Sequence, residues 1–310
     1  LRGELVQPSP ANAPRPPWRW VAAGVGLAGL VALGAWALLR PPSPEPLVFL
    51  PPEAERLPLV VVLYAEAPGV PPVDDLAARR AYLAEQVLPA LVAAGPRAVV
   101  LDFHFVGGAD DVALRRSLDD AREAGVPVLA ARPVGRSSEV KVCGREPSPG
   151  CVLDLLQVGV PTGEVRAWPL CIDEQMTLGH AVARLFAGPP TSGWRRDFWC
   201  LPEPVPLQPP PGDPCAAPWR RLWVSELVTG ETFTGPDPVS HQGDASCGAT
   251  AADLADQVVI VGDPRLSASG RDVVEVGGGE GGPVRVLPGA EAHAVAAWSF
   301  SGVLLPTHEP

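Results

Sequence analysis

The chain has 310 residues, which fits one large domain or two small ones, and 46% of them are hydrophobic. That share is ample for a buried core and excludes wholesale disorder. The net charge of −11 and a single lysine, Lys141, exclude nucleic acid as a partner, because phosphate contacts need a basic surface. The 40 prolines cluster in stretches that we expect to be linkers or irregular loops.

A transmembrane helix is predicted for residues 18–40, after a cytoplasmic juxtamembrane segment at 1–17. Val21–Leu39 carries no charge, and at the helical rise it would span about 28 Å, close to the hydrocarbon thickness of a bilayer. Trp18 and Trp20 stand at one end, as interfacial aromatic residues do. A cleaved signal peptide is the alternative, although its apolar core is normally shorter.

The charges that flank the span predict its orientation. Arginines are in excess before it, at Arg2, Arg15 and Arg19, which places the N-terminus in the cytoplasm. A proline-rich linker at 41–56 and a domain at 57–310 would then lie outside the cytoplasm. Small residues recur at every fourth position of the span, a pattern that permits helix pairing and indicates a possible homodimer. These residues are Gly24, Ala28 and Ala32.

All six cysteines follow the predicted span. Their even number, wide spacing and lack of a Cys-x-x-Cys motif are typical of disulfides in an oxidising compartment. Cys143 and Cys151 flank a turn and are the pair we expect first. A zinc site with His241 and Cys247 is the alternative, but the spacing matches no common finger. The six candidates are Cys143, Cys151, Cys171, Cys200, Cys215 and Cys247.

The first half of the outer domain alternates strands and helices, which predicts a parallel sheet with right-handed crossovers. Short apolar runs predict the strands, and apolar residues at helical spacing predict the helices. We expect Asp74 or Asp75 to cap the first helix and Pro89 to interrupt it. The predicted order is strand 59–63, helix to Gly95, strand 98–105, helix 111–124 and strand 126–130.

The second half adds antiparallel elements. Its predicted order is a hairpin of 152–160 and 165–170, a helix 177–187, a loop 188–218, a strand 258–262, two strands 272–276 and 284–287 around a glycine-rich turn, and a helix 289–300. The expected fold is therefore α/β: a three-layer arrangement with a mostly parallel sheet, antiparallel additions and helices on both faces, preceded by one transmembrane helix.

Polar residues follow three of the predicted buried strands. Glu66 follows the first strand, Asp102 and His104 end the second, and Asp263 ends the strand at 258–262. Ligands of open α/β sheets bind beyond the carboxyl ends of the strands, so neighbouring strands would bring three carboxylates together for a cation or an amine. Alternatively, these acids cap the helices that follow or satisfy loop amides.

The order of the motifs resembles the second type of CHASE domain, an extracellular sensory module associated with bacterial cyclases and histidine kinases. The last motif, hydrophobic-Pro-Gly-x-x-x-His-Ala, is the most specific. The resembling segments are Pro58–Tyr64, Ala98–Phe105, Val126–Ala131, Gly163–Arg166, Val258–Asp263, Asp272 and Leu287–Ala294. Where the family usually carries an Asp after the first strand, this chain has Tyr64-Ala-Glu66.

The resemblance implies a sensor of the bacterial inner membrane, single-pass, with its C-terminal domain in the periplasm or outside. Asp272 and His293 fall in the resembling motifs and complete the candidate ligand-binding residues, although His293 also fits a packing role. The expected partners are the lipid bilayer, an unknown extracytoplasmic ligand, and an output domain upstream of Leu1 or in a partner protein. No cofactor, metal or catalytic residue is predicted.

Two other functions remain open at this stage. The domain could tether a cytoplasmic partner without sensing anything. It could also be a periplasmic hydrolase that uses Asp102, His104 and Asp263.

Overall fold

The computed structural model describes residues 57–103, 112–133, 151–154, 164–172, 175–187, 204–233, 235, 247–265, 272–277 and 283–304. Within these ranges no helix combines the length and the apolar character that a bilayer crossing requires. The predicted span 18–40 and the linker 41–56 lie outside the described residues.

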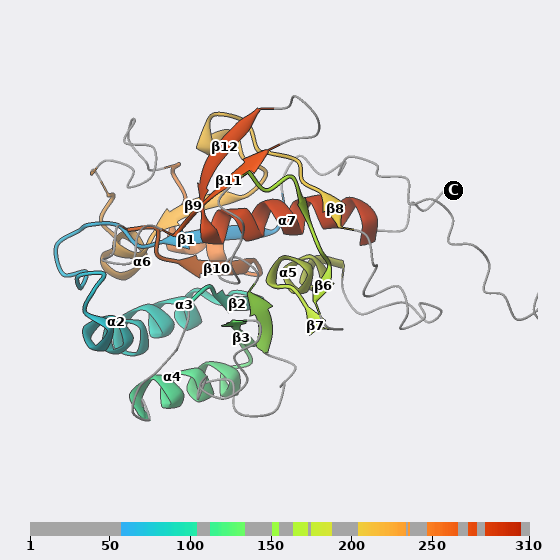
Figure 1. Cartoon of the computed structure of the whole chain (residues 1–310). Helices are drawn as coiled ribbons and strands as arrows, with labels where there is room; N and C mark the ends of the chain where they lie inside the picture. Colours follow the sequence, from blue (N-terminus) through green and yellow to red (C-terminus); the bar gives the residue numbers. More distant parts are fainter. Residues whose placement is uncertain are drawn as a thin grey trace, which may run out of the picture. The chain divides into compact units, whose positions relative to one another are not determined.

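A six-stranded sheet forms the centre of the domain, in the order β4-β3-β2-β10-β1-β9. Figure 1 labels β3, β2, β10, β1 and β9. Every pair of neighbouring strands is parallel. β1, β2 and β10 are buried along their whole length, as their continuous apolar sequences predict. The strands are β1 Leu59–Leu63, β2 Ala98–Leu101, β3 Val128–Pro133, β4 Cys151–Asp154, β9 Arg220–Trp223 and β10 Val258–Gly262.

Helices cover both faces of this sheet, so the α/β prediction is confirmed. Alternate residues of β1 point to opposite sides: Val61 packs with α5 and α7, whereas Val60 packs with the helices between β1 and β3 and with α6. We call these sides the α7 face and the α2 face. The helices are α2 Leu76–Tyr82, α3 Leu88–Ala94, α4 Val112–Glu123, α5 Leu178–Ala187, α6 Val224–Thr229 and α7 Gly289–Leu304.

Pro89 does interrupt the first long helix, and the structure shows how. A π-helical turn, Leu83–Val87, separates α2 from α3, and Pro89 stands in the first turn of α3. Proline has no backbone N–H, so the wider turn before it accommodates the missing hydrogen bond. The helix ends at Gly95, which takes the left-handed conformation expected of a C-terminal glycine.

Residues 155–163, which hold most of the first arm of the predicted hairpin and its turn, lie outside the described residues, so the hairpin stays a prediction. β4 joins the central sheet in parallel with β3, and β5 (Ala167–Trp168) pairs with β8 (Val205–Pro206). A run of apolar residues followed by a turn fits a buried parallel strand as well as a hairpin arm, and only the distant partner distinguishes them. The antiparallel pair of β11 (Val273–Gly277) and β12 (Val284–Pro288) is confirmed.

β9 is the strand that the sequence did not reveal. It begins with Arg220 and Arg221, which interrupt the apolar signal, and it pairs with β1 at the edge of the sheet. Two further short elements, β6 (Cys171–Ile172) and β7 (Gln175–Met176), pair with each other.

The prediction of disulfides is confirmed for one pair, Cys215–Cys247. Cys171 is disulfide-bonded as well, and no cysteine in the described ranges is free. The disulfide takes Cys247 out of any zinc site. Cys143, Cys200 and His241 lie outside the described residues, so the expected Cys143–Cys151 pair stays a prediction.

Candidate functional site

The strands that carry the predicted acids are neighbours, as the hypothesis of a shared edge required. β10 lies between β1 and β2. The Asp102 amide donates to the Val261 carbonyl (2.9 Å), and the Tyr64 amide donates to the Gly262 carbonyl (3.0 Å), so pairing continues to the carboxyl ends of all three strands.

The two buried acids nevertheless point to opposite faces of the sheet. Leu101 stands opposite Val261, so a continued register places Asp102 opposite Gly262 and places Asp263 one residue further on. Because side chains alternate along a strand, Asp102 falls on the α7 face and Asp263 on the α2 face. The predicted convergence of three carboxylates is therefore wrong, and a hydrolase that uses both aspartates is not supported.

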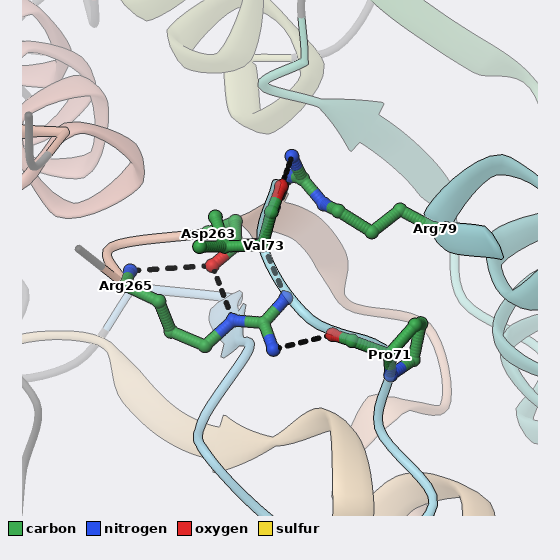
Figure 2. A network of polar contacts seen from close by, with 5 residues as sticks. All are labelled: Pro71, Val73, Arg79, Asp263 and Arg265. Carbon is green, nitrogen blue, oxygen red and sulfur yellow. Dashed lines mark hydrogen bonds and ion pairs between the residues drawn. The ribbon is translucent and has the colours of Figure 1, made fainter. Parts of the chain in front are cut away.

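Asp263 is the centre of a buried charged cluster on the α2 face (Figure 2). Arg265 binds both carboxylate oxygens, from Nε to Oδ1 and from Nη2 to Oδ2, each at 2.8 Å, and its backbone amide donates to Oδ1 at 3.2 Å. Arg79, from α2, contacts Oδ2 at 2.9 Å. The side chains of Asp263 and Arg265 are almost fully buried, whereas that of Arg79 is 19% exposed.

The same two arginines hold the segment between β1 and α2 against the edge of the sheet. Arg265 Nη1 donates to the Pro71 carbonyl at 2.7 Å, and Arg79 Nη1 donates to the Val73 carbonyl at 3.0 Å (Figure 2). Each guanidinium also lies near an aromatic ring. Arg265 is 5.3 Å from the centre of the Tyr64 ring, and Arg79 is 5.8 Å from that of Phe103.

The surroundings of the cluster shift the pKa values of Tyr64 and Arg265. Burial raises the pKa of Tyr64, and the neighbouring Asp263 charge raises it further, so its hydroxyl stays neutral. Burial alone would lower the pKa of Arg265, but the hydrogen bonds and charge of Asp263 more than offset this and raise it. Glu66, which is exposed, also raises the pKa of Arg265.

The α7 face has a different polar pair. His293, on α7, places Nε2 3.5 Å from Asp102 Oδ1, and both side chains are buried. The His293 ring meets the Trp168 ring edge to face, with 5.5 Å between their centres. His293 is completely buried and packs against Trp168. These contacts fit a packing role, which is one of the two roles that the sequence left open for it.

Asp272 supports the start of α7. The Gly289 amide donates to the Asp272 carbonyl at 3.0 Å, and a Cβ atom on Gly289 would lie only 2.5 Å from Asp272 Oδ2. The carboxylate thus rests against the first residue of the helix, where the helix dipole favours a negative charge. This position explains why the helix begins with a glycine, and it gives Asp272 a structural function.

A second buried ion pair links α7 to the edge strand. Arg221 of β9 binds Glu291 in two-pronged fashion, from Nε to Oε1 at 2.7 Å and from Nη2 to Oε2 at 2.8 Å. Both side chains are at most 4% exposed. Glu291 thus compensates the charge of Arg221, which is buried beside β1.

Sequence reasoning missed both arginines of the Asp263 cluster. The spacing Asp263-x-Arg265 was a usable signal, because the short loop allows the bidentate contact. Nothing local indicated Arg79, which belongs to a helix far earlier in the chain. His104 lies outside the described residues, and among those described no group of three acids, histidines or cysteines could hold a metal ion.

Comparison of the chain with protein-family models, with characterised proteins and with solved structures finds no match.

Proposed function

We propose that residues 57–310 form the extracytoplasmic, ligand-binding domain of a bacterial membrane-anchored sensor. Its binding site is the carboxyl edge of β1, β10 and β2 on the α2 face. Ligand binding is relayed through the predicted span 18–40 to an output upstream of residue 1 or in a partner protein. The resemblance to the second type of CHASE domain is part of this proposal.

The observation that carries the proposal is the buried Asp263 cluster. It lies where the connections that follow neighbouring strands lead to opposite faces of the sheet. β1 is followed by α2 and β2 by α4, both on the α2 face, whereas β10 leads on to α7 on the opposite face. Open α/β sheets bind ligands outside the carboxyl ends of their strands, where neighbouring connections diverge in this way. Asp263 and Arg265 stand at the end of β10, at this point.

The disulfides support the proposed location. Cys215–Cys247 and the bonded Cys171 fit an oxidising compartment, where such bonds persist. Cysteine labelling in cells checks this: the native chain should resist maleimide-polyethylene glycol until it is reduced. Rapid labelling of all cysteines without reductant would place the domain in a reducing compartment and contradict the proposal.

A non-sensing tether is the second candidate, and one observation favours it. The Asp263 carboxylate already receives four hydrogen-bond donors from its own chain, so the cluster is satisfied as it stands. In a tether, this cluster would serve only to fix the segment between β1 and α2.

A ligand screen separates the two candidates. The full chain, kept in mild detergent, is heated with each member of a panel of small organic acids, amines and sugars. A sensor should show a raised Tm with at least one class, and Arg79→Gln should abolish that rise. Arg220→Gln, at an exposed arginine of β9, is the matched control and should leave it unchanged. A panel without any stabilising compound, or a rise that Arg79→Gln does not alter, favours the tether.

A further inference from the structure

We propose that Arg79 and Arg265 form a recognition site for a ligand carboxylate, and that Asp263 is the internal carboxylate that occupies this site in the closed domain. The inference rests on the proposed function for the location of the site, and it adds the chemical class of the ligand. The ligand would pair with the two guanidinium groups and displace Asp263 from them.

The donors around Asp263 have the geometry of a carboxylate receptor. Arg265 presents two parallel N–H groups to the two oxygens, and Arg79 and the Arg265 backbone amide add one donor each. A planar guanidinium pairs with a planar carboxylate in this bidentate manner, which lysine cannot reproduce. The arrangement recognises the carboxylate group itself, whichever molecule carries it.

The two guanidinium groups have further contacts that do not involve Asp263. Arg265 lies over Tyr64 and donates to the Pro71 carbonyl, and Arg79 lies over Phe103 and donates to the Val73 carbonyl. Stacking on an aromatic ring and bonding to a fixed carbonyl both limit the movement of a guanidinium. The donors are therefore held in place for an incoming carboxylate.

The charges also favour a second anion. Two guanidinium groups share one buried carboxylate, and Arg79 keeps part of its side chain in contact with solvent. The acids of the adjoining segment, Glu66, Asp74 and Asp75, are exposed, so solvent and salt screen their charges. An anion that enters from the Arg79 side meets two guanidinium groups that share one buried carboxylate.

The segment between β1 and α2 is the cover through which a ligand would enter. Residues 66–75 are largely exposed, contain Pro68, Pro71 and Pro72, and turn at Gly69, whose φ of +80° suits glycine. The Pro71 and Val73 carbonyls attach this cover to the two arginines. A ligand would pass this cover to reach the two guanidinium groups, which stay bonded to the Pro71 and Val73 carbonyls.

Chemical rescue tests the inference without knowledge of the natural ligand. Asp263→Ala removes the internal carboxylate and leaves a void beside both arginines, so the Tm of the full chain should fall. Sodium formate, which fits the void, should then restore the Tm by roughly 5 °C at about 200 mM relative to sodium chloride of equal ionic strength. Formate should raise the Tm of the wild-type chain far less, because Asp263 competes from within the site.

Three variants and one salt make the result specific. Asp263→Asn fills the void with a neutral side chain of the same shape, so formate should not rescue it. Adding Arg79→Gln to Asp263→Ala should reduce the rescue, whereas Asp253→Ala, at the exposed pair with Arg220, should show none. Rescue by phosphate as strong as by formate would overturn the assignment to a carboxylate.

The absence of rescue in Asp263→Ala would overturn the inference. If this variant does not fold alone, its refolding yield in formate against chloride gives the same comparison. Rescue together with an empty ligand screen would leave the anion site standing and refute the sensor. Ligands that stabilise the wild-type chain while formate fails to rescue would refute the carboxylate assignment alone.

Discussion

The two faces of one sheet edge carry acids of the same kind in different surroundings. On the α7 face, Asp102 lies beside His293 under a well-packed helix. On the α2 face, Asp263 lies between two arginines under an exposed loop. One residue of strand register separates the two acids, and this difference determines the face of the sheet to which each one points.

The largest expected effect concerns the ion pair on the α7 face. Arg221→Ala leaves Glu291 buried without its partner and should lower the free energy of unfolding by about 3–5 kcal/mol. Arg220, the neighbour of Arg221 on β9, gives the matched control because its ion pair with Asp253 is partly exposed. Arg220→Ala should lower the free energy of unfolding by less than about 1 kcal/mol. Urea denaturation measures both. Equal losses would mean that the Arg221–Glu291 pair adds nothing beyond an exposed contact.

The Cys215–Cys247 disulfide tests whether the Asp263 cluster depends on the stability of the whole domain. Replacing Cys215 and Cys247 by serine opens a loop with a sequence separation of 32. The loss should be about 3–4 kcal/mol by the loop-entropy relation. Formate rescue of Asp263→Ala should persist in this background. A rescue that vanished would show that the charged cluster depends on the disulfide.

Acid should lower the free energy of unfolding through a buried histidine on the α7 face. His180, on α5, is fully buried; its Nδ1 lies 3.0 Å from the Leu170 carbonyl, and its Nε2 has no hydrogen-bond partner among the described residues. Burial lowers its pKa from 6.5 to about 4. The folded state resists a proton that the unfolded chain accepts, so the stabilisation is complete above pH 6.5 and is lost as the pH falls to about 4.

This linkage amounts to about 3 kcal/mol. His180→Asn keeps a donor for the Leu170 carbonyl but does not titrate, so its free energy of unfolding should change less over the same pH range. Urea midpoints at several pH values compare the two chains. Identical slopes would mean that other groups cause the acid sensitivity of the protein.

The smallest effect belongs to the cover of the α2 face. The Asp75 side chain accepts from the Ala78 amide at 2.9 Å and caps α2, the helix that carries Arg79. Asp75→Ala should lower the free energy of unfolding by about 1 kcal/mol, and Asp75→Asn, which can still cap, by less. Hydrogen exchange of the first turn of α2 should follow the same order. Equal exchange in the two variants would mean that the cap does not hold this turn.

The sequence predicted the strands of the sheet centre well, since runs such as Val258–Gly262 are apolar throughout and their burial follows from composition. The sequence-based prediction missed β9. There the buried charge of Arg221 is compensated by Glu291, which lies 70 residues later on α7. The prediction also placed three acids on one edge correctly but could not assign them to faces, because the register between β2 and β10 depends on pairing across the whole chain.

The sequence also could not predict the long-range contacts of the candidate site. Asp263 was named from the sequence, yet Arg79 and Arg265 define what surrounds it, and one of them comes from a distant helix. Local patterns indicate which residues end a strand. They do not indicate which side chains meet there.

The most direct measurement is the change in Tm that formate causes in Asp263→Ala, set against the change in Asp102→Ala. Our account predicts a clear rise for the first variant, whose void lies between two arginines, and little or none for the second, whose void lies beside His293. Equal responses of the two variants, or no response from Asp263→Ala, would contradict the assignment of the binding site to the α2 face.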